Sequence, residues 1–172
     1  DATHGRVMLL NNGTVEQDCF IGTLASVSDE VQVNDNDQVV FRQYSDDGLF
    51  SDVIRLDGSC SGPILGQGSL HGPTPKPFDV VLPRPTLNNT GRGVFSGTIN
   101  GYTHLGTRTN GSEAYSISPP KLAGTVDLYP MLADNDTTAV RWGGATSSPL
   151  LRINNAVLTN ADYIAESPDF IA

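Results

Sequence analysis

Apolar residues recur at every second position in several short stretches of the chain, and clusters of turn-forming residues separate these stretches. The alternation is clear at residues 6–10, 30–33 and 93–102, and the turn clusters include residues 12–13 and 34–37. A period of two residues is typical of half-buried β-strands. No stretch of about ten residues carries a helical apolar stripe without Gly, Pro or an Asn/Asp cluster inside it. The pattern therefore predicts an all-β chain.

The predicted strands are short and are separated by turn signals. They lie at residues 7–9, 14–21, 31–33, 39–44, 53–56, 78–82, 93–102, 126–128, 140–142 and 150–158, and residues 107–118 are predicted to form a hairpin around Asn110-Gly111. Residues 61–85 hold repeated Gly and Pro, which predicts a long surface connection that is strand-like only at residues 78–82. Short strands at this spacing in 172 residues predict a single β-sandwich or jelly-roll domain, immunoglobulin-like or related.

The composition changes this picture mainly by excluding partners. The formal net charge is −9 and the isoelectric point is near 4.5. An acidic surface without a basic stripe repels a phosphate backbone, so we expect no binding to nucleic acid. No apolar run approaches the roughly 20 residues of a membrane-spanning helix, so we also expect no insertion into a membrane.

The chain has two cysteines, Cys19 and Cys60. They form no CxxC pair and have no histidine cluster near them, so they do not indicate a metal site. An even pair of this kind predicts one disulfide in an oxidising compartment. The alternative is two buried, reduced thiols.

The sequence supplies no complete set of catalytic residues. His4, His71 and His104 lack the spacing of a zinc site or a catalytic triad. Residues 58–62 read Gly-Ser-Cys-Ser-Gly, which has the form of a nucleophile elbow, but the next residues break the helix that an elbow requires. We therefore expect that Cys60 is not a nucleophile and that the chain is not an enzyme and has no cofactor.

Two acidic clusters raise the hypothesis of a metal site. They are Asp-Asn-Asp at residues 35–37 and the pair Asp46-Asp47. Calcium takes about six to eight oxygen ligands from alternating positions around a tight turn. Neither cluster completes such a set, and Asp and Asn also favour turns. We expect turns and no metal at both places.

The first third of the chain has a distinctive order of features. Residues 5–15 read Gly-Arg-Val-Met-Leu-Leu-Asn-Asn-Gly-Thr-Val, and Cys19 follows shortly afterwards. Cys60 comes after a second alternating run at residues 52–58. This order resembles the opening of the chaperone–usher pilins, which are subunits of bacterial surface fibres. The Gly/Pro-rich stretch and the last six residues, 167–172, depart from that family's pattern.

The resemblance implies that residues 1–12 form a donor arm and that residues 13–172 form the sandwich domain. In such fibres the extended N-terminus of one subunit is added as a strand to the incomplete sandwich of its neighbour. The inserting side chains would be Thr3, Gly5, Val7 and Leu9. The alternative is that residues 5–10 are the first strand of the chain's own closed sandwich.

These features predict a non-enzymatic extracellular subunit that assembles with copies of itself into a pilus-like surface fibre. One alternative is a projecting or attachment domain of a virus or phage particle, which would bind a host receptor through its loops. Another is a carbohydrate-binding sandwich in which Tyr102, Tyr115 and Trp142 stack on the sugar rings of a host glycan. The aromatic residues are otherwise expected to pack in the core. All three functions place the chain outside the cell or on a particle surface.

Overall fold

The computed structural model describes residues 6–11, 14–20, 25–45, 50–58, 60–69, 77–113, 116–117, 130–141, 150–153 and 161–165. Within these ranges the chain is all-β and contains no helix, which confirms the predicted fold class. The same residues accordingly include no helix that is long and apolar enough to cross a membrane.

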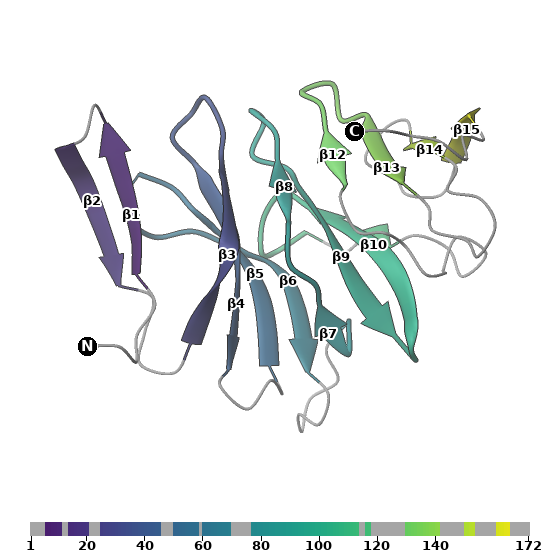
Figure 1. The fold of residues 1–172 in the computed structure, drawn as a ribbon, viewed down its shortest axis with the longest axis horizontal. Helices are drawn as coiled ribbons and strands as arrows, with labels where there is room; N and C mark the ends of the chain where they lie inside the picture. The colour runs from purple at the N-terminus through teal and green to yellow at the C-terminus, as the bar shows by residue number, and fades with distance from the viewer. Residues whose placement is uncertain are drawn as a thin grey trace.

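The strands form a hairpin and three larger sheets, and every pair of neighbouring strands is antiparallel (Figure 1). The strands are β1 Arg6–Asn11, β2 Thr14–Phe20, β3 Ala25–Val33, β4 Val39–Ser45, β5 Phe50–Leu56, β6 Ile64–Ser69, β7 Val80–Val81, β8 Thr86–Leu87, β9 Gly93–Ile99, β10 Tyr102–Arg108, β11 Ser116–Ile117, β12 Met131–Leu132, β13 Thr138–Arg141, β14 Leu150–Ile153 and β15 Ala161–Ala165. The hairpin is β1–β2. The sheets have the strand orders β3-β4-β5-β6, β11-β10-β9-β7 with β8 also paired to β9, and β12-β13-β14-β15.

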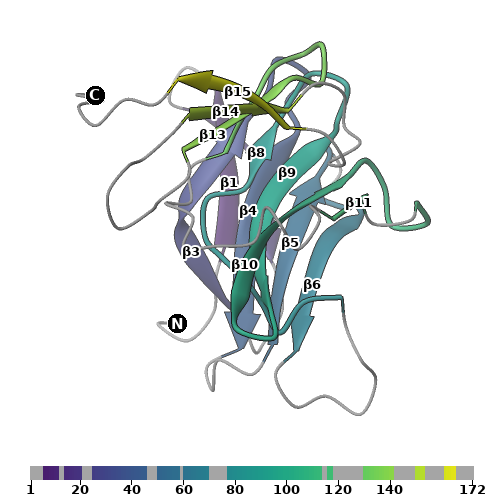
Figure 2. The same ribbon diagram turned by 90° about the vertical axis from the view of Figure 1, so that its right-hand side faces the viewer.

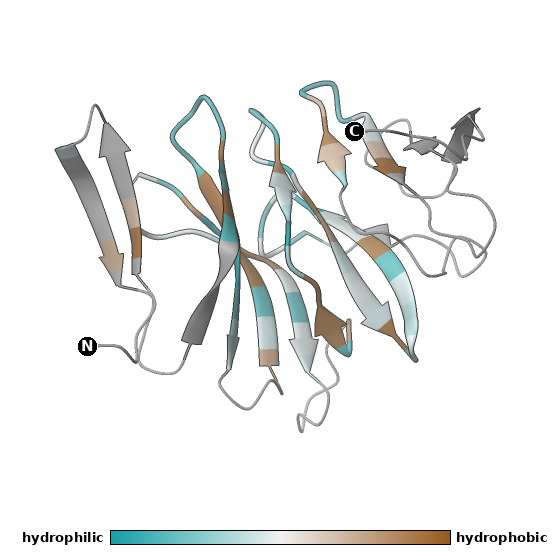
Figure 3. Cartoon of the chain, in the orientation of Figure 1, coloured by the Kyte–Doolittle hydropathy of each residue, from teal (hydrophilic) through white to brown (hydrophobic). Residues whose placement is uncertain are grey.

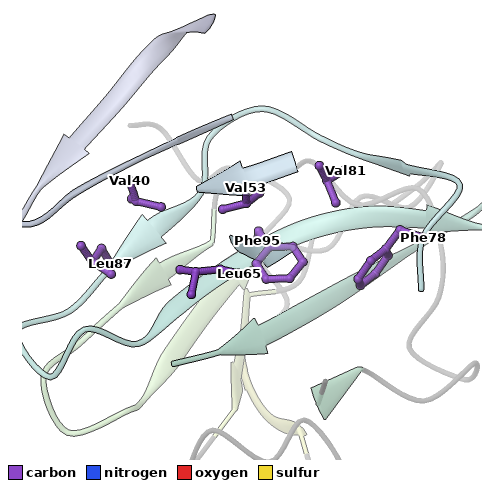
Figure 4. Packing of buried hydrophobic residues seen from close by; sticks show 7 residues of the cluster. All are labelled: Val40, Val53, Leu65, Phe78, Val81, Leu87 and Phe95. Carbon is purple, nitrogen blue, oxygen red and sulfur yellow. The ribbon is translucent and has the colours of Figure 1, made fainter. Parts of the chain in front are cut away.

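The sheet β3–β6 and the sheet around β9 pack face to face, and Figure 2 shows β9 and β10 in front of β4 and β5. The apolar core between them consists of Val40, Val53, Leu65, Phe78, Val81, Leu87 and Phe95 (Figure 4). The rings of Phe78 and Phe95 meet edge to face, with centroids 5.5 Å apart and an interplanar angle of 72°. Two sheets packed around one layer of side chains form a β-sandwich.

The central sheet β3–β6 is buried on its second face as well. Val39, Val40 and Phe41 are consecutive buried residues of β4. Successive side chains of a strand point to opposite faces, so Val40 joins the sandwich core while Val39 and Phe41 point away from it. On that side Val39 and Phe41 pack with Ile54, Leu56, Val7 and Cys19. The hairpin β1–β2 therefore covers the outer face of the central sheet.

The Gly- and Pro-rich residues 61–85 do not form one long surface connection, so this prediction was wrong. Their first part is β6, which pairs with β5 and buries Leu65 completely. The glycines of β6 make room for neighbouring groups. A Cβ atom on Gly66 would lie 2.6 Å from the ring of Phe95, and one on Gly68 would lie 2.8 Å from the backbone of β7. Glycine serves close packing between strands here and does not mark a loop.

Four hairpin turns in the described part of the chain share one backbone form. In each five-residue turn the first N–H donates to the fifth carbonyl, and the fourth N–H donates to the first carbonyl. The turns are residues 34–38, 57–61, 88–92 and 133–137, and their fourth residues, Asp37, Cys60, Gly91 and Asp136, have positive φ. This is a type I turn followed by a left-handed residue, a position that Asp, Asn and Gly accept most easily. The turn predicted at residues 34–37 is confirmed.

Candidate functional site

The residues that the sequence assigns to a donor arm lie partly in β1, which pairs with β2 of the same chain. Val7 lies opposite Cys19 in this hairpin and is buried, and Leu9 lies in the same strand. Thr3 and Gly5 are outside the described residues. In the single chain, β1 belongs to its own molecule, and its transfer to a neighbour stays a prediction.

The predicted disulfide between Cys19 and Cys60 is present, and it fixes the hairpin to the central sheet. The two Cα atoms are 5.2 Å apart. Cys19 is buried in β2, whereas Cys60 is exposed in the turn between β5 and β6. Because the two sulfur atoms are bonded to each other, Cys60 has no thiol that could act as a nucleophile in this state. A structural disulfide is typical of proteins outside the reducing cytoplasm.

Three of the hairpin turns meet at one end of the sandwich and form a polar surface, which we call the loop platform. It consists of residues 34–38, 88–92 and 133–137. These turns lie at the upper ends of β3, β8 and β12 in Figure 1, and Figure 3 shows that they are mostly hydrophilic. Each turn belongs to a different sheet, so the loop platform joins all three larger sheets of the molecule.

Asn89 lies at the centre of the loop platform. Its side-chain amide donates to the carboxylates of Asp35 and Asp134 at 2.8 and 2.9 Å. Its Oδ1 accepts the backbone N–H of Asp35 at 2.9 Å, and its own N–H donates to Asp134 at 2.8 Å. Its carbonyl oxygen accepts the side-chain amide of Asn36 at 2.6 Å. One asparagine therefore binds both neighbouring turns with its backbone and its side chain.

Asn88 makes a second set of bonds and is only 2% exposed. Its amide donates to Asp136 at 2.8 Å and to the carbonyl oxygen of Ala133 at 3.3 Å. Its Oδ1 accepts the backbone N–H of Arg92 at 2.9 Å within its own turn. Its carbonyl oxygen accepts the side-chain amide of Asn34 at 2.8 Å. The buried Asn88 thus forms hydrogen bonds with polar groups in all three turns.

Arg55 of β5 connects the loop platform to the loop after β10. Its Nη1 donates to the carbonyl oxygens of Gly91 and Thr109, at 2.5 and 2.9 Å. Its Nε lies 3.2 Å from the carboxylate of Asp57, which in turn accepts the side-chain amide of Gln38 at 3.0 Å. Hydrogen bonds from a charged donor are stronger than neutral ones, so this guanidinium holds several loops in fixed positions.

Of the two acidic clusters in the sequence, the structure describes only residues 35–37. Residues 35–37 form a turn, as predicted, and Asp35 is hydrogen-bonded to Asn89. Asp46 and Asp47 lie outside the described residues. Within the described ranges, no group of three or more His, Cys, Asp or Glu residues could hold a metal ion.

The histidines of the sequence are not brought together by the described structure. His104 is buried in β10, and His4 and His71 lie outside the described residues.

Of the three aromatic residues that could stack on sugar rings, the structure describes only Tyr102. Tyr102 is 63% exposed, so the expectation that it packs in the core was wrong. It directly follows the two-residue turn Asn100-Gly101, where both residues have positive φ, and it therefore stands at the tip of the hairpin β9–β10. Tyr115 and Trp142 lie outside the described residues.

The pKa of Glu113, in the loop after β10, is lowered by its hydrogen bonds. The backbone N–H of Thr109 donates to this carboxylate at 2.7 Å, and that bond is the largest cause that lowers the pKa of Glu113 below its ordinary value. The guanidinium of Arg92 lies 3.9 Å from Glu113 and acts in the same direction.

A comparison of the chain with models of known protein families found no match, and a comparison with curated proteins found none. The sequence alone does not predict the loop platform. The runs at residues 88–91 and 133–137 are rich in turn-forming residues, and this signal marks each turn. No pattern along the chain indicates that three turns from three sheets meet.

Proposed function

We propose that this chain is a non-enzymatic structural subunit that acts outside the cytoplasm and assembles with copies of itself by adding strands at sheet edges. The observation that carries the proposal is the position of exposed apolar side chains. Met8 of β1 is 52% exposed, Val31 and Val33 of β3 are 47% and 60% exposed, and Met131 of β12 is 65% exposed. In the described strand orders, β1, β3 and β12 are all end strands.

An end strand presents unpaired N–H and C=O groups on its open side. Proteins that stay monomeric usually protect such strands with charge, proline or a covering loop. Apolar side chains on an end strand instead favour the addition of a strand from another chain, because the backbone groups pair and the side chains leave water. The disulfide supports an extracellular setting for this assembly.

The form of assembly we propose is a pilus-like fibre in which the N-terminal strand of one subunit enters its neighbour. The resemblance to pilins supports this form, and the inserting residues are Thr3, Gly5, Val7 and Leu9. The hairpin β1–β2 supports it too, because this hairpin is a separate two-stranded sheet that shares no strand pairing with β3 in the described structure.

Deleting residues 1–10 tests the strand exchange. The full-length chain should form filaments in electron micrographs. The truncated chain should stay folded, form no filaments, and bind a synthetic peptide of residues 1–10. A peptide that carries Val7→Asp and Leu9→Asp is the matched control and should not bind. A truncated chain that aggregates and gains nothing from the peptide would show that β1 completes its own molecule.

A second candidate function is attachment of a virus or phage particle to a host receptor or glycan. The loop platform favours it, since loops held in place by a rigid scaffold are common binding surfaces. Asn36 and Asn135 are exposed on this surface. Under this function, Asn36→Ala combined with Asn135→Ala should remove binding to host cells in flow cytometry and leave self-assembly unchanged.

A further inference from the structure

The end strand β3 has an open side in the described structure. It pairs only with β4 there, and the register joins Val31 to Phe41, Gln32 to Val40 and Val33 to Val39. Some backbone N–H and C=O groups of β3 therefore face the open side and could pair with another strand.

The turn after β3 shows which backbone groups of this strand face the open side. The backbone N–H of Asn34 donates to the carbonyl oxygen of Gln38 at 3.0 Å, so Asn34 faces β4. In an antiparallel pair the direction of these groups alternates from one residue to the next. Gln32 therefore also faces β4, and Val31 and Val33 direct their N–H and C=O groups to the open side. Two donors and two acceptors thus stand beside two exposed apolar side chains.

The side chains of Val31 and Val33 lie on the outer face of the central sheet, the face that the hairpin β1–β2 covers at other strands. Their cross-strand partners Phe41 and Val39 pack beneath the hairpin β1–β2. Side chains of directly opposite residues lie on the same face of a sheet. The two valines are therefore the uncovered margin of the face that this hairpin buries.

We infer that two copies of this chain pair through β3, antiparallel about a two-fold axis at Gln32. In this register Val31 of each copy lies opposite Val33 of the other. These are the residues whose N–H and C=O groups face the open side, so each such pair can exchange two backbone hydrogen bonds. The contact joins two central sheets into one continuous sheet. It deepens the proposed self-assembly, but it uses neither residues 1–10 nor the loop platform.

We infer that the strand added to the open side of β3 is β3 of a second copy, because this strand is complementary to itself in the proposed register. The two Val31–Val33 pairs lie on one face and extend the apolar surface across the axis. The axis sets Gln32 opposite Gln32 of the second copy, and amides can both donate and accept. Glu30 falls opposite Asn34. The next pair, Asp29 with Asp35 of the second copy, carries like charges, but it falls where the register of β3 is irregular and where the turn begins. An isologous contact of this kind closes as a dimer.

The full-length variant Gln32→Cys tests this register directly. Opposite residues of a pair without mutual hydrogen bonds have Cα atoms about 4.5 Å apart, which is within the range of a disulfide. The purified variant should form a covalent dimer on a non-reducing gel, and peptide mapping should find the bond between the two copies of residue 32 with Cys19–Cys60 intact. Without reductant, a chain that stays monomeric at every concentration would overturn the pairing.

The matched control is Val31→Cys. The two copies of residue 31 are diagonal to each other across the axis, about 7–8 Å apart, and should not be joined efficiently. A bond through residue 31 in place of residue 32 would overturn the proposed axis. In sedimentation experiments, Val33→Lys should raise the dissociation constant of the dimer at least about tenfold, because the substitution acts twice, whereas Met8→Lys should leave it unchanged.

The outcomes separate this contact from strand exchange. If filaments need residues 1–10 but Gln32→Cys gives no covalent dimer, the β3 contact is wrong and strand exchange stands. If the covalent dimer forms and the full-length chain gives dimers but no filaments, strand exchange is wrong and the β3 contact stands.

Discussion

At the residue scale, two adjacent asparagines join the turns of three sheets. The amide of asparagine donates and accepts hydrogen bonds on a short side chain, whereas an ionised carboxylate only accepts. Asn88 and Asn89 use their amide groups to bind carboxylates and backbone atoms of both neighbouring turns. Aspartate at either position would set a second carboxylate beside the first, so the residue type is fixed by its partners.

Asn88→Ala should lower the free energy of unfolding by about 1–3 kcal/mol, because it removes a buried amide that bonds its own turn and the turn at residues 133–137. Asn88→Asp should destabilise as well, since it brings a carboxylate to the position that now donates to Asp136. Urea denaturation followed by circular dichroism measures both changes. Asn135→Ala is the control, because Asn135 is exposed and its side chain accepts the backbone N–H of Thr137 in its own turn. Equal effects at positions 88 and 135 would contradict the role given to Asn88.

Glu113 should make the stability of the protein depend on pH. Its pKa is lowered in the folded state, so it stabilises the fold at pH values above its unfolded pKa, and this contribution is lost as the pH falls through its folded pKa. Between about pH 7 and about pH 3, the Tm of the wild type should therefore fall further than that of Glu113→Gln. Differential scanning calorimetry over this range checks the sign. Parallel curves for the two proteins would show that Glu113 contributes nothing.

At the element scale, glycines allow the strands to come close to the aromatic rings of the core. Gly106 of β10 lies opposite Phe95 of β9. A Cβ atom on Gly106 would lie 2.6 Å from the Phe95 ring and 2.8 Å from the Phe78 ring. Gly97 has the same relation to Phe78, at 2.4 Å. The rings fill the space that these residues leave, so glycine is part of the packing.

Gly106→Ala should lower the free energy of unfolding by about 1–3 kcal/mol, because the added methyl group overpacks the core. Gly111→Ala is the matched control, since its Cβ atom would have no neighbour closer than 3.9 Å. Chemical denaturation compares the two. Adding Phe95→Leu to Gly106→Ala should recover part of the loss, as the smaller side chain frees the space. A double variant whose loss equals or exceeds the sum of the single losses would refute the steric explanation.

At the scale of the whole molecule, the central sheet β3–β6 is the layer on which the others are built. One face packs against the sheet around β9, and the other packs against the hairpin β1–β2. The loop platform joins the three larger sheets at one end. The disulfide joins the hairpin to the turn after β5. The hairpin is thus held by packing and by a covalent bond, while the larger sheets are joined by packing and hydrogen bonds.

Replacing both cysteines, Cys19→Ala with Cys60→Ala, should cost about 4 kcal/mol of stability, because the bond closes a loop of 41 residues in the unfolded chain. The loss should be accompanied by faster hydrogen exchange in β1 and β2 than in β4 and β5. Urea denaturation and exchange measured by mass spectrometry test the two parts. Uniformly faster exchange across these strands would show that the disulfide does not hold the hairpin in particular.

The class of fold and the local backbone follow from the sequence alone. Alternation with a period of two residues predicts strands, and Asn, Asp and Gly predict turns, because both depend only on neighbouring residues. The turn at residues 34–37 and the strand at Val39–Ser45 follow from such local chemistry. The disulfide followed from the number and spacing of cysteines. Local signals mislead where glycine serves long-range packing, so the glycines of residues 61–69 predict a loop where the structure has β6.

Which elements meet depends on how the whole chain packs, and no local pattern predicts it. The three turns of the loop platform are far apart in the chain, and their contacts arise because the sheets stack with those ends aligned. The exposure of Val31 and Val33 has the same origin, since an alternating strand looks alike in a sequence whether it lies in the middle of a sheet or at its end. A strand's neighbours are set by packing over long separations along the chain, and that information is absent from any single stretch of residues.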